Sequence, residues 1–193
     1  MTQRAYNFAA GPAVLPESVL AQIQREIMVL PGPKASILEI SHRSPTFKEI
    51  IEAAEANIRK LLKISDDYAV LFLQGGGRLL FSMIPMNLAT KEKPSADYIV
   101  TGTWGKAALK EAKKEGLARV AWDGADSKYT HTPADSDLDL DPNAAYLHYT
   151  CNETIEGVQF PSEPQGGEVP LVCDASSDFM HKPIPIDRYG MIY

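Results

Sequence analysis

The apolar residues of this chain follow two patterns in succession. Between residues 16 and 62 they recur every three or four positions, which is typical of amphipathic helices. Pro16 suits the first turn of one helix, and Ser44 followed by Pro45 begins another. From residue 68 onward, short and nearly continuous apolar runs predict strands, which are residues 68–73, 98–100, 118–122, 145–149, 169–173 and 190–193.

Helical segments separate several of these strands. Glycines at residues 75–77 predict a tight turn into a helix over 79–86, and a further helix is expected over 104–115, ended by Gly116. Continuous apolar strands that alternate with helices indicate a mostly parallel sheet that is covered on both faces. The pattern therefore predicts an α/β fold, with one domain or slightly more in 193 residues.

Composition narrows the classes of function. The chain has 45% hydrophobic residues and a formal net charge of -6. The lysines of its densest basic stretch, residues 106–114, are interleaved with Glu111 and Glu115. Nucleic acid is not expected as a partner, because phosphate backbones attract clustered lysine and arginine. No apolar run approaches the roughly 18 residues of a membrane helix, and the first residues lack the apolar stretch of a secretory signal. We therefore expect a cytoplasmic protein with no membrane partner, in which Cys151 and Cys173 are reduced thiols.

Two patterns that resemble metal sites fail on their spacing. Asp135, Asp137, Asp139 and Asp141 alternate as in a calcium loop, but the position that requires glycine is Leu140. The four histidines lack the spacing of zinc ligands. No metal site is therefore expected.

A glycine-rich segment follows the first predicted strand directly. In open α/β sheets, ligands bind outside the carboxyl ends of the strands. The glycines at 75–77 would let backbone N–H groups approach an anion at the start of a helix, and Arg78 could contact a phosphate. The spacing matches neither a Walker loop nor the Rossmann fingerprint. A tight strand-to-helix turn with a solvated arginine is the alternative.

Trp104 and Asp174 also follow predicted strands. Trp104 opens a helix, and its flat side chain could stack on a planar ring or take part in ordinary helix packing. Asp174 ends a buried strand, where a carboxylate is costly unless it has a partner. A protonated pyridinium nitrogen would be such a partner, and a cap of the following serine turn is the alternative.

His42 and Arg43 precede the helix that begins at Ser44. A cation beside a helix N-terminus suits an anionic substrate better than it suits the helix, and a surface loop is the alternative. Together these residues suggest an anionic, aromatic, nitrogen-containing cofactor and an acidic substrate.

Six stretches, in order along nearly the whole chain, match one known family. They are residues 6–12, 41–44, 72–78, 102–105, 151–157 and 173–178. The Asn-Phe-Ala-Ala-Gly-Pro start and the Asn-Glu-Thr-Ile-Glu-Gly stretch are the most distinctive. The chain thus resembles the phosphoserine aminotransferases of the class V aminotransferase family. The resemblance implies pyridoxal 5'-phosphate (PLP) as cofactor and the large domain of PLP fold type I, with helices flanking a mostly parallel sheet.

The resemblance implies a role for each candidate cofactor-binding residue. Gly77 and Arg78 would hold the phosphate of PLP, and Trp104 would stack on its ring. Thr154 would bond to the polar edge of the ring. Asp174 would pair with the pyridine nitrogen.

The resemblance also implies the reaction and the partners. An amino group would pass from L-glutamate to 3-phosphohydroxypyruvate, giving O-phospho-L-serine and 2-oxoglutarate for serine biosynthesis. Arg43, with His42, would bind the acidic groups of the substrate. The family is homodimeric, and some members also serve pyridoxine biosynthesis.

One departure from the family concerns the catalytic lysine. In the family, the strand that begins here at residue 189 leads into a turn that carries the Schiff-base lysine, so that lysine is expected beyond Tyr193 and no catalytic residue is assigned in this chain. Lys182 lies before the strand and is not given the role. We expect residues 1–15 to form an N-terminal arm, and residues 16–193 to form part of a PLP-binding large domain without the C-terminal small domain. The isolated polypeptide is expected to be inactive unless a complementing C-terminal segment is supplied.

Two alternatives stay open. One is a different PLP enzyme of the same fold, such as an alanine–glyoxylate-type aminotransferase or a cysteine desulfurase. The other, for the isolated fragment, is a non-catalytic α/β binding module.

Overall fold

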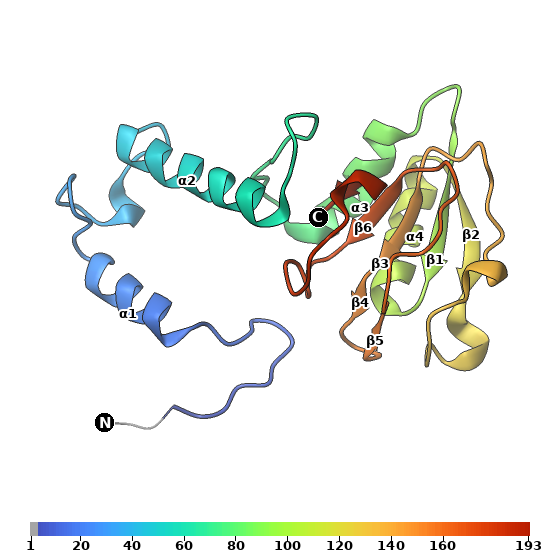
Figure 1. Cartoon of the computed structure of the whole chain (residues 1–193), viewed down its shortest axis with the longest axis horizontal. Helices are drawn as coiled ribbons and strands as arrows, with labels where there is room; N and C mark the ends of the chain where they lie inside the picture. Colours follow the sequence, from blue (N-terminus) through green and yellow to red (C-terminus); the bar gives the residue numbers. More distant parts are fainter. Residues whose placement is uncertain (1–3) are drawn as a thin grey trace. The chain divides into compact units, whose positions relative to one another are not determined.

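A computed structural model describes residues 4–193. These residues fall into two compact units that meet in the sequence between Leu71 and Phe72 (Figure 1). Residues 1–3 of the expected N-terminal arm lie outside the described residues. Among the described residues, no helix combines the length and the apolar character needed to cross a membrane. Whether both units belong to one domain of a longer protein stays a prediction.

The first unit contains the helices α1 (Glu17–Glu26) and α2 (Pro45–Leu62), with a short 3-10 helix at Ile37–Glu39 between them. The side chain of Ser44 accepts a hydrogen bond of 3.3 Å from the N–H group of Phe47 and so caps α2. The predicted helix starts at residues 16 and 44–45 are confirmed.

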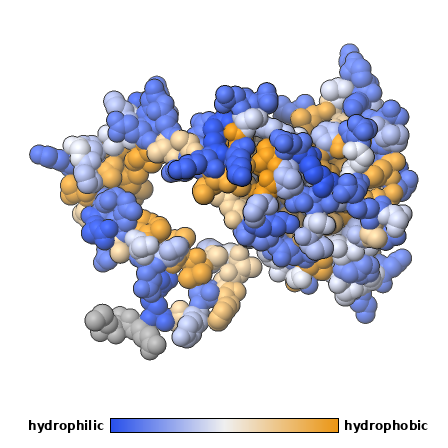
Figure 2. Space-filling view, viewed as in Figure 1, coloured by the Kyte–Doolittle hydropathy of each residue, from blue (hydrophilic) through white to orange (hydrophobic). Residues whose placement is uncertain are grey.

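The first unit buries little of its apolar surface. Ser36 and Leu62 are its only buried residues among those described, whereas Val19 and Ile23 of α1 are 42% and 47% exposed. Figure 2 shows apolar surface over this unit. The apolar stripes of its helices therefore do not form a core within the unit.

The second unit is built on a five-stranded parallel sheet. In sheet order the strands are β2 (Leu117–Asp123), β1 (Ser95–Val100), β3 (Leu147–Thr150), β6 (Leu171–Asp174) and β7 (Tyr189–Ile192). A two-stranded antiparallel hairpin, β4 (Asn152–Glu153) and β5 (Val158–Gln159), follows β3. The predicted α/β fold with a mostly parallel sheet is confirmed.

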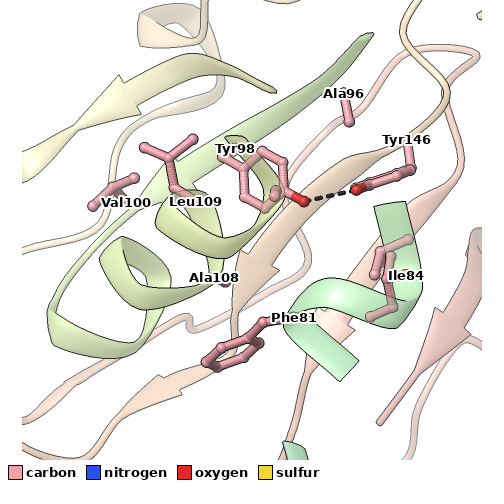
Figure 3. Packing of buried hydrophobic residues seen from close by; sticks show 10 residues of the cluster. Phe81, Ile84, Ala96, Tyr98, Val100, Ala108, Leu109 and Tyr146 are labelled. Atoms are coloured by element: carbon pink, nitrogen blue, oxygen red, sulfur yellow. Dashed lines mark hydrogen bonds between the residues drawn. The ribbon is translucent and has the colours of Figure 1, made fainter. Parts of the chain in front are cut away.

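Two helices pack on one face of this sheet: α3 (Gly76–Leu88) and α4 (Thr103–Glu115). Figure 3 shows the core between helices and sheet, where the hydroxyl groups of Tyr98 and Tyr146 form a hydrogen bond of 2.7 Å. Phe81 of α3 is buried in the same cluster. This packing places the first turns of α3 and α4 at the carboxyl edge of the sheet.

Non-helical segments cover the opposite face of the sheet. Phe160 and Ile184 pack there against Leu147, Tyr149 and other buried strand residues. Both faces are thus covered, as the apolar strands predicted. In the described part of this unit, however, the two α-helices lie on one face.

The predicted strand at residues 68–73 is wrong. Residues 69–73 form no strand in the described part of the chain, and Leu71, Phe72 and Leu73 are 68%, 51% and 54% exposed. An apolar run becomes a strand only when a neighbouring strand pairs with its backbone. No described strand pairs with this run, so its composition alone does not produce the predicted element.

Candidate functional site

The candidate cofactor-binding residues of the second unit lie at the carboxyl edge of its parallel sheet. Asp174 is the last residue of β6, and Thr150, the last residue of β3, lies directly opposite it in the register. Trp104 follows β1 closely, and Thr154 follows β3. Because carboxyl ends of parallel strands meet at one edge, residues that are far apart in sequence come together here.

The turn into α3 leaves the first N–H groups of that helix open. Gly75 and Gly76 have φ angles of 101° and 61°, a left-handed backbone that favours glycine. Gly75, the N-cap residue of α3, provides no side-chain cap. The first N–H groups of a helix have no partner within it and carry partial positive charge, so this end of α3 suits an anion.

Gly77 lies close to the loop that follows Asp174. A Cβ atom built on Gly77 would lie 2.9 Å from Oγ of Ser176 and 3.7 Å from the ring of Tyr193. The N–H group of Ser176 in turn donates a hydrogen bond of 3.0 Å to Oδ1 of Asp174. Ser176 therefore lies beside both the start of α3 and the carboxylate that ends β6.

Asp174 is a buried acid without a counter-ion among the described residues. Its side chain forms no described ion pair, and the residue is 5% exposed. Burial raises the pKa of Asp174, the hydrogen bonds from Ser176 oppose that rise, and the charge of Asp178 adds to it. A cationic group placed beside the carboxylate would offset this cost.

Trp104 is held at both ends by the β4–β5 hairpin. Its indole Nε1–H donates a hydrogen bond of 3.1 Å to Oγ1 of Thr154, and its backbone N–H donates one of 2.9 Å to Oε2 of Glu153. The side chain is half-buried, so part of its surface stays open for stacking.

Two carboxylates of the hairpin close the N-terminus of α4. Glu153 Oε1 accepts a hydrogen bond of 2.7 Å from the N–H group of Gly105, in addition to the one from Trp104. Glu156 Oε1 accepts hydrogen bonds from the N–H group and the hydroxyl of Thr103, at 3.0 and 2.6 Å. The first turn of α4 is thus occupied by the protein's own acids, whereas no described acid occupies that of α3, which suits an external anion.

The hairpin also reaches the loop after β6. Nδ2 of Asn152 donates to Oγ of Ser177 at 2.9 Å, and the Ser177 hydroxyl donates to the Asn152 carbonyl at 3.0 Å. Through these contacts the structure brings four predicted residues to one edge: Gly77, Trp104, Thr154 and Asp174.

Arg78 lies in the first turn of α3. Its side chain is exposed. Its charge helps to lower the pKa of Glu111 on α4, after the hydrogen bond from Lys114. Its expected contact with a phosphate stays a prediction.

His42 and Arg43 belong to the first unit. Both side chains are exposed just before α2, and neither forms an ion pair with a described residue. The N–H group of Arg43 donates a hydrogen bond of 3.1 Å to Oγ of Ser41. Their proposed contact with substrate stays a prediction.

Sequence reasoning missed the residues that join the site together. Glu153 and Glu156 were part of a distinctive stretch but received no role. Ser176 and Tyr193 were likewise unassigned. The position of Ser176 just after a strand end was the available signal, whereas the reach of Glu153 to α4, 49 residues away, has no signal in local sequence.

Other groups of the second unit lie outside this edge. Lys182 donates to the carbonyl of Pro161 at 3.3 Å and lies 3.6 Å from Oε1 of Glu163, which satisfies its charge. It lines, with Cys151 and Cys173, a cavity of about 20 Å³, which has room for one water molecule. Within the described residues, no group of three or more His, Cys, Asp or Glu side chains could hold a metal ion.

Relatives of known name match the whole length of this chain. A phosphoserine aminotransferase from Rhodopirellula baltica is 54% identical over 192 residues, which are 99% of this chain and 51% of that protein. One from Laribacter hongkongensis is 52% identical over 97% of this chain and 52% of its own length. The chain therefore spans about half the length of the curated relatives it matches.

Solved structures agree with these sequence matches. A phosphoserine aminotransferase from Bacillus circulans subsp. alkalophilus superposes with a TM-score of 0.93 at 43% identity, covering 99% of this chain and 53% of its own. A PLP-bound phosphoserine aminotransferase from Trichomonas vaginalis has a TM-score of 0.91 at 35% identity, over 98% of this chain and 56% of its own. An alanine–glyoxylate aminotransferase from Nostoc sp., at 16% identity and a TM-score of 0.62 over 99% of this chain and 49% of its own, shares the fold alone.

One family profile covers nearly every residue. The profile described as "Aminotransferase class-V" matches residues 5–193, which include both units and all the predicted site residues. The fold, the arrangement of the carboxyl edge and this match agree. The chain belongs to the class-V aminotransferase family.

Proposed function

We propose that this chain forms the cofactor-binding half of a PLP-dependent phosphoserine aminotransferase. The complete protein would transfer an amino group from L-glutamate to 3-phosphohydroxypyruvate and release O-phospho-L-serine and 2-oxoglutarate. PLP supplies the electron sink for this chemistry when it is bound. The residues at the carboxyl edge bind and orient it.

The observation that carries the proposal is that Ser176 lies beside both Gly77 and Asp174. An open helix N-terminus, which suits a phosphate, is therefore close to a buried carboxylate without a counter-ion among the described residues, which suits a pyridinium nitrogen. PLP carries both groups on one ring. The Cβ-free surface of Gly77 lets the phosphate approach the first N–H groups of α3.

The remaining cofactor contacts fit the same ring. Trp104 would stack on it, and the N–H of Arg78 would add to the phosphate contact. Thr154 would bond to the polar edge through the donor capacity of its hydroxyl, which at present accepts from Trp104. The PLP-bound relative from Trichomonas vaginalis, with 35% identity over 98% of this chain, supports this assignment.

The choice of substrate rests on the similarity of whole sequences. Relatives named phosphoserine aminotransferase reach 54% identity, whereas the alanine–glyoxylate aminotransferase reaches 16%. Arg43 and His42 would bind the acidic groups of the substrates, because both are exposed beside the start of α2 and Arg43 has no described ion pair. We further propose a homodimer in the cytoplasm, acting in serine biosynthesis and also in pyridoxine biosynthesis.

We propose that the polypeptide of 193 residues does not transaminate by itself. Lys182 is engaged by Glu163 and Pro161, which makes it a poor candidate for the Schiff-base lysine. The expected arm (1–15) and partial large domain (16–193) would supply binding groups. A C-terminal segment, as the longer relatives have, would supply the lysine and the small domain.

Mixing experiments test this division of roles. The polypeptide is incubated with PLP, alone and with a C-terminal segment taken from a full-length relative, and the product is treated with borohydride and examined by mass spectrometry. We expect a cofactor adduct only in the mixture, on the added segment. An adduct on Lys182 of the polypeptide alone would contradict the assignment.

The proposed reaction is tested on a full-length protein that contains this chain. With L-glutamate as donor, the rates with 3-phosphohydroxypyruvate and with glyoxylate are compared. We expect kcat/KM to favour the phosphorylated acceptor by at least about 100-fold, since a site built to bind the phosphate of its substrate loses that contact with glyoxylate. A preference for glyoxylate, or equal rates, would overturn the proposed substrate.

A further inference from the structure

The β4–β5 hairpin fixes the backbone of Trp104 as well as its indole. Glu153, whose residue is fully buried, accepts two N–H groups in the first turn of α4, from Trp104 and Gly105. The next residue, Thr154, accepts the indole N–H of Trp104. Consecutive hairpin residues thus hold both ends of one side chain, across 49 and 50 positions of sequence.

Gly102, the N-cap residue just before α4, leaves space for the Glu153 carboxylate because it has no side chain. A Cβ atom on Gly102 would lie 2.7 Å from Cδ of Glu153 and 2.5 Å from Oε2 of Glu156, so any larger residue would displace the two acids. The hairpin itself is closed by a hydrogen bond of 2.8 Å from the Gly157 N–H to the Glu153 carbonyl. The start of α4 and the closed hairpin therefore both accommodate the Glu153 side chain.

Burying the carboxylate of Glu153 in this position costs folding free energy. Burial raises the pKa of Glu153, the two N–H donors oppose the rise, and the charges of Glu156 and Asp174 add to it. An ordinary serine or aspartate cap would satisfy the same helix end without burying a glutamate 49 residues away. What Glu153 adds is a rigid connection between α4 and the hairpin that carries Thr154.

We propose that Glu153 is a positioning residue for Trp104: it fixes the first turn of α4 relative to the β4–β5 hairpin, so that the indole is already oriented for stacking when the cofactor binds. The inference deepens the proposed function and rests on it. Glu153 acts through Trp104 and does not itself touch the cofactor. Pre-organisation of this kind strengthens binding because the ordering cost is already met in the free protein.

The isosteric variant Glu153→Gln separates shape from hydrogen bonding. Glutamine keeps the volume but replaces one accepting oxygen by an NH₂ group, which would face a backbone N–H group of Trp104 or Gly105. That unfavourable pair would shift the first turn of α4 and release the indole. We expect the Kd for PLP to rise by about 10-fold or more in a full-length protein that contains this chain. We also expect the circular dichroism of the bound cofactor to weaken.

Asp97→Asn is the matched control. Asp97 is also a buried carboxylate that accepts a backbone N–H group, that of Asp141 at 2.6 Å, and it lies on β1 away from the carboxyl edge. Its loss should lower thermal stability but leave the Kd for PLP and the dichroism of the cofactor unchanged. Equal effects of both variants on PLP binding would show that burial alone is being measured, and would overturn the inference.

Gly102→Ala supplies an independent test through the same contact. The added methyl group would push Glu153 and Glu156 from the helix end without changing either acid. We expect weaker PLP binding, as for Glu153→Gln, and this variant decides the matter if Glu153→Gln does not fold. If both variants bind PLP with the wild-type Kd and dichroism, the inference is wrong while the proposed function stands. If the wild-type protein itself does not bind PLP, the proposed function fails and this inference with it.

Discussion

Gly77 and Ser176 lie so close that a single methyl group on the glycine would lie 2.9 Å from the serine Oγ. Ser176 also donates its N–H group to Asp174. The absence of a side chain at Gly77 thus keeps the start of α3 accessible next to the acid that ends β6. Binding of a cofactor phosphate at this edge requires that the start of α3 stays accessible.

Gly77→Ala should weaken cofactor binding with little cost to folding. The methyl group would narrow the approach to the first N–H groups of α3, but the atom it meets is the hydroxyl oxygen of the exposed Ser176, which can turn about one bond, and alanine favours the helix over glycine by up to about 1 kcal/mol. We expect the Kd for PLP to rise about 10-fold and the melting temperature to stay equal or increase. Fluorescence titration and thermal melts measure the two quantities.

Gly116→Ala is the comparison for that variant. Gly116 lies just after α4, and the nearest atom to a Cβ there would be 3.8 Å away. Its substitution should leave PLP affinity unchanged. Unchanged affinity in Gly77→Ala as well would mean that the phosphate does not bind at the start of α3.

Asp174→Asn should stabilise the cofactor-free protein while removing cofactor binding. Burial raises the folded-state pKa of Asp174 above its ordinary value of 3.8, so the folded state holds the proton more tightly than the unfolded state. Ionisation therefore costs stability as the pH rises above about 4, and the asparagine variant escapes this cost.

The pH dependence of the melting temperature separates the effect of Asp174 from the effects of the other buried acids. Melting temperatures of wild-type and Asp174→Asn proteins without PLP should coincide below about pH 4 and diverge by a few degrees at pH 7, with the variant higher. Added PLP should raise the melting temperature of the wild type alone. A variant that is less stable at pH 7 would contradict the view that Asp174 lacks a counter-ion.

Arg78→Ala should have a small effect on cofactor binding. The guanidinium group is exposed, and solvent screens its charge, so we expect the residue to contribute chiefly its N–H group in the first turn of α3. We expect the Kd for PLP to change less than about 3-fold, at both low and high salt. A rise beyond 10-fold that depends on salt would instead show direct contact between the guanidinium group and the phosphate.

Thr154→Val should loosen the indole of Trp104. Valine keeps the shape but removes the oxygen that accepts the indole N–H at 3.1 Å, and leaves that donor half-buried without a partner. We expect PLP binding to weaken about 5- to 10-fold, in line with the loss of one hydrogen bond of about 1 kcal/mol. Thr154→Ser keeps the hydroxyl and should restore binding, and failure of that rescue would point to a packing role instead.

The sequence was sufficient for the parts of the fold that local patterns encode. The apolar stripes and the Ser44–Pro45 start gave the helices of the first unit, and continuous apolar runs gave the five strands of the sheet. Asp174 was recognisable because an acid at the end of a buried strand is costly. The apolar run at 69–73 was misleading, because strand formation also requires a partner that composition does not reveal.

The site was predictable in its parts but not in its connections. Trp104 follows the end of β1, and the glycines at 75–77 mark the turn into α3; both features are visible in local sequence. The Glu153 contact to α4 and the Ser176 contact to Gly77 depend on the tertiary fold. Arg78 lies in the first turn of α3 with an exposed side chain, and its expected contact with the phosphate stays a prediction.

A crystal structure of a full-length protein containing this chain, grown with PLP, tests the central claim most directly. The quantity to measure is the distance from the pyridine nitrogen to the Asp174 carboxylate, with the phosphate located in the same map. We expect about 2.7–2.9 Å, with phosphate oxygens at the N–H groups of Gly77 and Arg78. A phosphate bound away from α3, or a pyridine nitrogen beyond hydrogen-bond distance of Asp174, would contradict the account.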